Sequence, residues 1–393
     1  MNPAFNAQQV ISALNHLSAS SLIIGAETNL PRKPPRSNFP LLQALTPDLH
    51  CQTFSSPSVP SLRHIILVDN SSGRLDPLPL KSLAPYPSIL EDGGPGKPLP
   101  PQNLNPNDTI NIQFTSGTTS APKAAALTHR SILNNGHSIG ARMLLSPSDI
   151  ICCPPPLFHC FGCILGYMAS ATHGASIVFP SETFDAQATL LAAQEEKCTA
   201  LYGVPTMFLS YLELLASGTV PHKSFSHLRT GIAAGSSIPA ELMRKLHKVL
   251  NLTELTICYG MTETSPVSAM TTTDDPLEKR IDSVGRVLPH VSAKVVDIAD
   301  PNRVVPVGQR GELAVSGYLV MKEYWGAPEQ TKEVLVRDQA RKVWMMVRVF
   351  HPPAPCPPSP LSPHSPSPLP TPSFKHQPHH RPATKPSSTQ KAT

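Results

Sequence analysis

Hydroxyl-bearing side chains are concentrated in one short segment of this 393-residue chain, residues 114–123, which reads FTSGTTSAPK. Its candidate ligand-binding residues are Thr115, Ser116, Gly117, Thr118, Thr119, Ser120 and Lys123. Glycine lets the backbone turn so that amides can point at an anion, and the lysine adds positive charge. We expect the segment to follow a strand and precede a helix. It predicts a phosphate-binding loop, although GxxxxGK[ST] is absent and a plain hydroxyl-rich turn is the alternative.

A second cluster of chemically capable residues is Tyr259-Gly260-Met261-Thr262-Glu263, which follows an expected strand at residues 254–258. Ligands in open α/β sheets bind beyond the carboxyl ends of the strands. A tyrosine ring offers a flat face to a base, and a carboxylate is a hard ligand for a hard cation such as Mg²⁺. The alternative for Glu263 alone is a solvated acid in a surface loop.

Two further segments carry candidate residues. Gly235 and Ser236 begin GSSIP after an expected strand at residues 228–234; the alternative there is an ordinary strand-to-helix turn with a serine cap. His159 lies in PLFHCFG, where a structural histidine beside apolar residues is the alternative to a functional one. The pairs Cys152-Cys153 and Cys160/Cys163 sit in apolar segments, where cysteine behaves as a small hydrophobic residue, so we do not expect them to bind zinc.

The elements that must position these residues follow an alternating pattern. Strands are expected at residues 109–115, 150–153, 176–179 and 200–202, and helices at 131–143, 160–171, 185–196, 205–216 and 239–250. Thr128 is expected to cap the first of these helices. This alternation predicts an α/β fold with a largely parallel sheet. Residues 281–316 predict a small β-rich subdomain, and residues 70–108 a linker or surface loop.

The motifs together resemble those of the adenylate-forming superfamily of AMP-forming acyl-CoA synthetases, from the first residues to about Met346. The FTSGTTSAPK segment is similar to the family's phosphate loop, with Ser120 where the family usually has glycine. The resemblance implies a large layered N-terminal domain of mostly parallel sheets and helices. It also implies that Tyr259 packs on adenine, Thr262 contacts phosphate, Glu263 holds Mg²⁺, and Gly235 and Ser236 line the adenine and acyl pockets. His159 would lie near the substrate carboxylate or gate the acyl tunnel.

The reaction that the resemblance implies has two steps and uses ATP, Mg²⁺ and coenzyme A. A fatty, medium-chain or secondary-metabolite carboxylic acid is converted to acyl-AMP, and the acyl group is then transferred to CoA. Lys123, Thr262, Glu263 and His159 are the expected catalytic residues. Acyl-CoA ligases are favoured over peptide-synthetase adenylation domains and luciferases.

Family elements expected further along the chain are not found. Val347-Arg348-Val349 stands where a Thr-Gly-Asp triplet is expected, and no C-terminal domain with its lysine follows. The upstream part of the large domain is also expected to be missing. We therefore expect a truncated, impaired ligase, with a read-through intron or frameshift near Met346. The alternative is an inactive fragment that acts as an interaction protein through a proline-rich tail able to bind SH3-like grooves.

Composition bounds these expectations. Of the net charge of +5, the tail from residue 351 carries +4, which leaves a nearly neutral body unlike a nucleic-acid binder. No secretory signal, membrane-spanning run or C-terminal peroxisomal signal is recognised, so we expect a cytoplasmic protein. The expected divisions are residues 1–108, a partial N-terminal part; 109–280, the ATP- and acyl-binding core; 281–346, the β-rich subdomain; and 347–393, a disordered tail.

Overall fold

The structure is a computed structural model that describes residues 1–31, 33–75, 80–92, 103–115, 122–221, 225–338 and 342–347. The predictions for residues 116–121 and for residues 348–393 therefore lie outside the described residues.

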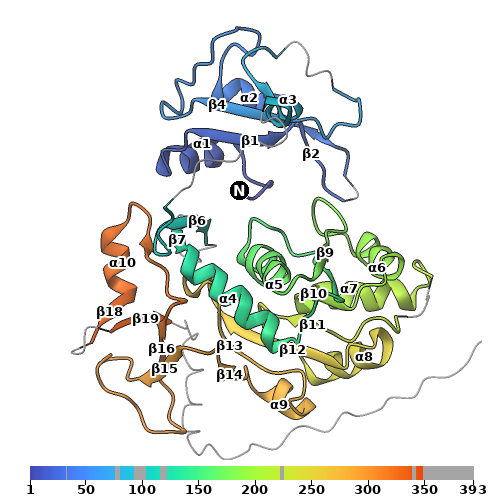
Figure 1. Ribbon diagram of the computed structural model, residues 1–393, viewed down its shortest axis with the longest axis vertical. Helices are drawn as coiled ribbons and strands as arrows, with labels where there is room; N and C mark the ends of the chain where they lie inside the picture. Colours follow the sequence, from blue (N-terminus) through green and yellow to red (C-terminus); the bar gives the residue numbers. More distant parts are fainter. Residues whose placement is uncertain are drawn as a thin grey trace, which may run out of the picture. The chain divides into compact units, whose positions relative to one another are not determined.

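The largest described sheet has seven strands in the order β14-β13-β12-β11-β10-β8-β9 (Figure 1). Their bounds are β8 Ile150–Cys152, β9 Ser176–Val178, β10 Ala200–Gly203, β11 Thr230–Ala233, β12 Glu254–Gly260, β13 Val267–Met270 and β14 Arg286–Val287. The pairings from β9 to β12 are parallel, whereas β13 and β14 add antiparallel strands. This sheet confirms the predicted α/β fold with a mostly parallel arrangement.

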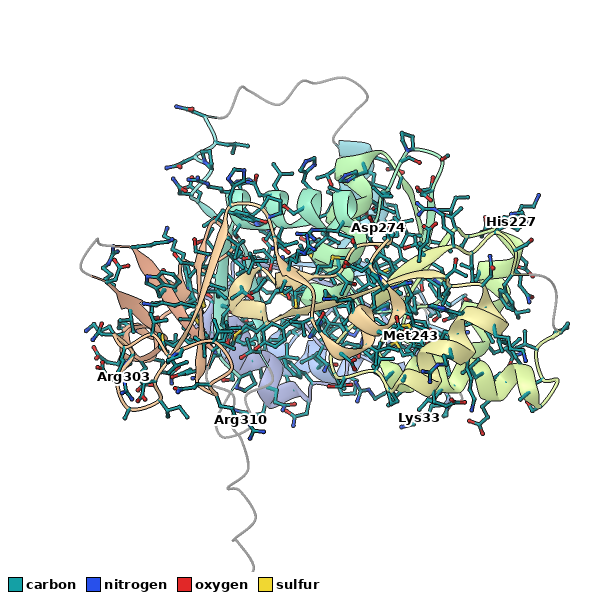
Figure 2. All side chains as sticks on the ribbon, turned by 90° about the horizontal axis from the view of Figure 1, so that it is seen from below. Lys33, His227, Met243, Asp274, Arg303 and Arg310 are labelled. Carbon is teal, nitrogen blue, oxygen red and sulfur yellow. The ribbon has the colours of Figure 1, made fainter. Side chains whose placement is uncertain are left out.

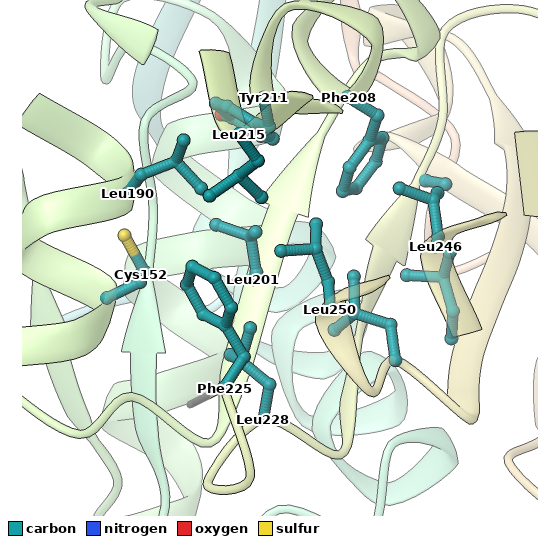
Figure 3. Packing of buried hydrophobic residues seen from close by; sticks show 14 of the residues in the cluster. Cys152, Leu190, Leu201, Phe208, Tyr211, Leu215, Phe225, Leu228, Leu246 and Leu250 are labelled. Carbon is teal, nitrogen blue, oxygen red and sulfur yellow. The ribbon is translucent and has the colours of Figure 1, made fainter. Parts of the chain in front are cut away.

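Successive strand residues bury against opposite faces of this sheet. In β10, Leu201 belongs to one apolar cluster, whereas Tyr202 belongs to another. The Leu201 cluster is covered by α6 Ala186–Glu195, α7 Pro205–Ala216 and α8 Ala240–Leu250. Figure 3 shows Phe208 and Tyr211 of α7 in this cluster. Their ring centroids lie 5.8 Å apart, and the rings are nearly perpendicular. Two-sided burial explains why the parallel strands have apolar residues at successive positions.

The opposite face is covered by three helical segments: α4 His129–Arg142, η1 Phe161–Met168 and α5 Ala169–His173. Thr128 caps α4 as predicted, because its hydroxyl accepts the Ser131 amide at 3.1 Å. The expected α-helix at residues 160–171 is instead the π-helical η1 followed by the short α5. Close approach of α4 to this segment requires glycine, since a Cβ on Gly136 would lie 2.7 Å from the Met168 Cβ.

The N-terminal residues form their own parallel sheet, β1-β4-β5, with its own apolar cluster. The elements here are α1 Ala7–His16, β1 Ser21–Gly25, β2 Glu27–Thr28, β3 Arg36–Ser37, α2 Phe39–Leu45, β4 His64–Val68, β5 Ala84–Pro85 and α3 Tyr86–Asp92. The prediction of a linker over residues 70–108 is wrong in part. Leu80 and Leu83 are buried in this cluster, and β5 and α3 follow them.

Besides the two-stranded antiparallel pair β2-β3, the described fold has two larger antiparallel sheets. One has the order β17-β7-β6, with β6 Thr109–Phe114, β7 Ala124–Thr128 and β17 Glu323–Tyr324. The other has the order β15-β16-β19-β18, with β15 Val291–Val296, β16 Glu312–Gly317, β18 Leu335–Arg337 and β19 Val343–Val347. The remaining elements are α9 Leu277–Asp282, η2 Thr262–Thr264 and α10 Pro328–Val334. The expected β-rich character of residues 281–316 is confirmed, whereas the domain boundaries stay predictions.

Figure 2 labels Met243, which is fully buried on α8, and Arg303 and Arg310, which are exposed between β15 and β16. Among the described residues, no helix combines the length and apolar character needed to span a bilayer.

Candidate functional site

The segment that carries Lys123 is the connection of a β-hairpin. β6 and β7 pair antiparallel, and beyond their last pair the Thr115 amide donates to the Lys123 carbonyl at 2.8 Å. The expectation that this segment precedes a helix is wrong, because β7 comes first and α4 follows it. The structure therefore holds Thr115 and Lys123 at the two ends of a closed hairpin. The other predicted loop residues, Ser116 to Ser120, lie outside the described residues.

The second motif lies at the carboxyl end of β12. Tyr259 and Gly260 are the last residues of the strand, and Thr262 and Glu263 lie in the single turn η2 that follows. The pairing with β13 shifts register between Tyr259 and Gly260. Gly260 is required there, since a Cβ would lie 1.8 Å from the Pro266 carbonyl oxygen. The turn is then fixed by Thr264, whose hydroxyl accepts the Met261 amide at 3.1 Å and donates to the Pro266 carbonyl at 2.7 Å.

Tyr324 of β17 joins the two motifs. Its hydroxyl donates to Glu263 Oε1 at 2.7 Å, and Lys123 Nζ lies 5.0 Å from the centroid of its ring. β17 pairs with β7, and the neighbouring Trp325 amide donates to the Ala124 carbonyl at 2.7 Å. The structure thus brings Lys123 and Glu263 to one place through a tyrosine that the sequence analysis did not select.

The Glu263 carboxylate is not a solvated loop acid, because its residue is only 6% exposed. Its backbone carbonyl accepts the Met321 amide at 2.8 Å, which fixes the turn from the other side. Tyr324 occupies Oε1, while Oε2 has no hydrogen-bond partner among the described residues. Burial first, and then the negative charge of Glu263, raise the pKa of Tyr324, so the phenol stays a proton donor.

The free oxygen of Glu263 suits a magnesium ion. Mg²⁺ in nucleotide sites is commonly held by one or two carboxylates, with waters and substrate phosphates as the remaining ligands. One fixed carboxylate with an unpaired oxygen, with a threonine hydroxyl in the same turn, is a donor set of that kind. Among the residues that the structure describes, no group of three or more His, Cys, Asp or Glu side chains is placed to hold a metal ion.

His159 and Thr262 are linked through Cys160. The Cys160 thiol lies 3.7 Å from the Thr262 hydroxyl and 3.7 Å from His159 Nδ1. Burial raises the pKa of Cys160 to about 11, so this sulfur remains a thiol. His159 Nδ1 accepts the Phe161 amide at 3.1 Å, and partial burial lowers the pKa of the imidazole. A neutral ring with its proton on Nε2 follows from that hydrogen bond.

The remaining predicted residues flank this cluster at the same edge of the sheet. Tyr259 is half-buried and packs on the apolar cluster that contains Tyr324, Cys160 and Ile164. Gly235 and Ser236 follow β11, the parallel neighbour of β12, and both are exposed. Gly235 has φ +92, a left-handed conformation that favours glycine. Ser236 does not cap α8, whose N-cap is Pro239 without a side-chain hydrogen bond.

Comparison with known proteins places this geometry in a family. The family model described as "AMP-binding enzyme" matches residues 1–325. The acyl-CoA ligase SID4 of Ajellomyces capsulatus is 40% identical over 350 residues, which are 88% of this chain and 56% of that protein. The acyl-CoA ligase sidI of Aspergillus fumigatus is 49% identical over 257 residues, 64% of this chain and 43% of that protein.

A third relative and a solved structure extend the comparison. The mitochondrial medium-chain acyl-CoA ligase ACSF2 of Danio rerio is 36% identical over 348 residues, 86% of this chain and 55% of that protein. A long-chain-fatty-acid-CoA ligase from Archaeoglobus fulgidus superposes with a TM-score of 0.69 at 22% identity, and the match covers 88% of this chain and 63% of that one. The chain spans about half the length of the curated relatives it matches. On the strength of the family match and the shared fold, the chain belongs to the AMP-binding enzymes, a family whose matched relatives here are acyl-CoA ligases.

Proposed function

We propose that this chain carries the nucleotide-binding part of an acyl-CoA ligase that activates a carboxylic acid with ATP and passes the acyl group to CoA. The observation that carries the proposal is the bridge made by Tyr324. It holds a lysine from the hydroxyl-rich hairpin and the carboxylate of the Tyr259–Glu263 motif at one position. The names of the matched relatives support an acid as the substrate class, and one of them names a medium-chain acid.

The reaction is written in two steps. A carboxylate oxygen of the acid attacks the α-phosphorus of ATP, and the bond to the pyrophosphate oxygen breaks to give acyl-AMP. The CoA sulfur, after losing its proton, then attacks the acyl carbon and AMP leaves. The first step depends on positioning and charge neutralisation more than on covalent chemistry by the protein.

The residues of this chain would supply that positioning as follows. The Lys123 ammonium neutralises phosphate charge, while Thr115 and the residues from Ser116 to Ser120 donate hydrogen bonds to phosphate oxygens from hydroxyls and amides. Thr262 donates its hydroxyl to a phosphate oxygen, and Tyr259 packs against the adenine beside Gly260. Gly235 and Ser236 border the adenine and acyl pockets on the neighbouring strand.

Glu263 and His159 would act on the charged groups. Glu263, with Oε1 fixed by Tyr324, offers Oε2 to Mg²⁺, and that ion would neutralise charge on the phosphates. His159 is neutral and holds Nδ1 as an acceptor, so Nε2–H is available to donate to the substrate carboxylate. Its alternative role, as a gate of the acyl tunnel, needs the same neutral ring.

The experiment that tests the proposal is acid-dependent release of pyrophosphate with ATP and Mg²⁺, combined with trapping of acyl-AMP by hydroxylamine. Carboxylic acids of increasing chain length are compared. Lys123→Ala and Glu263→Gln should each lower the rate by about 10²-fold or more. Lys245→Ala, a substitution of an exposed lysine on α8, is the matched control and should leave the rate unchanged. Equal rates for all three variants, or release that does not depend on acid, would overturn the proposal.

Two accompanying predictions remain open. The cytoplasmic location stays a prediction, and the ACSF2 relative is named as mitochondrial. A partner for the proline-rich segment at residues 347–393 also stays a prediction, since residues 348–393 lie outside the described ones.

A further inference from the structure

A cleft of about 1040 Å³ lies between the start of α4, the residues that follow β16, and the segment from α10 to β19. Its described lining includes no aspartate or glutamate but five lysine or arginine residues: Arg130, Lys322, Lys332, Arg337 and Lys342. His290 also lines it. Because the body of the chain is nearly neutral, five cations around one recess are an uneven distribution of charge.

Most of this charge is not neutralised by the part of the chain that the structure describes. The side-chain charges of Arg130, Lys322 and Arg337 are on exposed residues, and no described residue forms a hydrogen bond or an ion pair with them. Lys332 pairs with Glu329 at 2.8 Å, but both side chains are more than 70% exposed, and such pairs contribute little. The Lys342 ammonium lies 2.8 Å from the Ser292 hydroxyl and over the Trp344 ring, whereas the Lys342 backbone amide donates to the Asp338 carboxylate at 2.9 Å.

The cleft is distinct from the candidate nucleotide site. β7 runs from one to the other: Ala124 lies beside Lys123, whereas Thr128 at the far end lines the cleft. Four residue steps along a strand cover about 13 Å. Met321 forms part of the wall between them, since it lines the cleft and donates its amide to the Glu263 carbonyl. A phosphate group held by these five cations is therefore not the one that Lys123 would contact.

The shape and the charge together indicate an anionic ligand. A recess with low-dielectric walls concentrates the field of the charges that line it, so the local concentration of anions rises. Arginine binds phosphate through paired donors and lysine as a point charge. The volume is close to the upper limit for small-molecule sites, which commonly measure about 300–1,000 Å³. We propose that this cleft binds a small polyphosphate anion, one that carries two or more phosphate groups, at a site separate from Lys123 and Glu263.

The test measures pyrophosphate binding by isothermal titration calorimetry on the full chain carrying Lys123→Ala, which suppresses binding at the candidate nucleotide site. Arg130→Glu with Arg337→Glu should weaken binding at least tenfold. Raising the salt concentration should weaken pyrophosphate binding to the Lys123→Ala protein without the charge reversals, because partly exposed charges are screened. Both reversed residues are exposed, so the midpoint of thermal unfolding should change little.

The matched control is Arg244→Glu with Lys279→Glu, which reverses the same number of exposed cations on α8 and α9 away from the cleft. This control should retain the affinity of the parent. Equal weakening by the control and the cleft variant would show diffuse attraction to net charge and overturn the proposal, as would unchanged binding in the cleft variant. Displacement of pyrophosphate by ATP, by CoA or by dephospho-CoA then identifies which source of phosphate the cleft prefers.

Discussion

At the scale of single residues, the site depends on how Glu263 and its neighbours are held. A buried carboxylate needs partners, and here one oxygen takes the Tyr324 hydroxyl while the other remains available. The same tyrosine ring lies under Lys123, so one side chain orients groups from two distant segments. The sequence motifs pointed to Lys123 and Glu263, but Tyr324 is 61 residues from Glu263 and its sequence gives it no role in the site, so the contact between them is revealed only by the fold.

The substitution Tyr324→Phe tests the role of the Tyr324 hydroxyl separately from that of its ring. The phenylalanine keeps a ring beneath Lys123 but leaves Oε1 of Glu263 without its donor, a loss of about 1.5–3 kcal/mol for a hydrogen bond to a charged group. We expect the variant to need a several-fold higher Mg²⁺ concentration than the parent for ATP binding, which calorimetry measures. Tyr202→Phe is the control, because it removes a buried hydroxyl that contacts the Met143 sulfur instead. An equal shift in both variants would contradict the role given to Tyr324.

His159 should titrate below the usual range for histidine. Burial lowers its pKa, and its Nδ1 must remain an acceptor for the Phe161 amide. Because the folded state favours the neutral ring, this stabilisation is present above the unfolded pKa of about 6.5 and is lost as the pH falls. NMR of the imidazole nitrogens measures this directly. His159 is itself an exposed residue, so a pKa at or above the usual value for histidine would contradict the assignment.

At the scale of elements, the strands that carry the motifs are set by pairing as much as by propensity. The strands at residues 150–153, 200–202 and 228–234 could be predicted, since short apolar runs between turns are typical of buried parallel strands. β7 could not, because its sequence AAALT is rich in alanine and lacks the β-branched run of a strong strand. It is a strand because β6 and β17 pair with it on both sides.

Gly260→Ala should disrupt the end of β12. A Cβ there would lie 1.8 Å from the Pro266 carbonyl oxygen, so β12 and β13 would have to separate just before η2. We expect a loss of about 3 kcal/mol or more in the free energy of unfolding. Gly308→Ala is the comparison, since its φ of +89 is strained but no atom lies within 4 Å, and it should cost about 1 kcal/mol. Similar losses in denaturant titrations of the two variants would contradict the steric argument.

At the scale of the whole molecule, the candidate site lies at the carboxyl ends of the parallel strands of the main sheet. An ionic network lies at their amino ends. Asp149 precedes β8 and accepts hydrogen bonds from Thr199 at 2.7 Å and from Arg229 at 3.0 Å. Arg229 also pairs with Glu254 at 2.7 Å. These residues precede or begin four neighbouring parallel strands, so the network fixes their relative position. Apolar periodicity predicts the strands, but it does not predict which charged residues meet at their amino ends.

Asp149→Ala should therefore destabilise the sheet as a unit. Asp149 is only 4% exposed, and removing it would take from Arg229 one of its two carboxylate partners and from the Thr199 hydroxyl its shortest acceptor. We expect about 3 kcal/mol of lost unfolding free energy, at the low end for a broken buried pair because Arg229 is partly exposed. The exposed pair Glu241–Lys245 supplies the control, and Glu241→Ala should cost less than about 0.5 kcal/mol. Urea titrations measure both losses, and an equal loss of unfolding free energy in Asp149→Ala and Glu241→Ala would contradict this account.

The central claim is that the hairpin ending at Lys123 and the turn holding Glu263 serve one nucleotide. A double-mutant cycle of Lys123→Ala and Glu263→Gln, read as the affinity for ATP in the presence of Mg²⁺, tests it most directly. Two groups on one bound ligand should be coupled, so the loss in the double variant should differ from the sum of the single losses by about 0.5 kcal/mol or more. Strictly additive losses, or no loss in either single variant, would contradict a shared site.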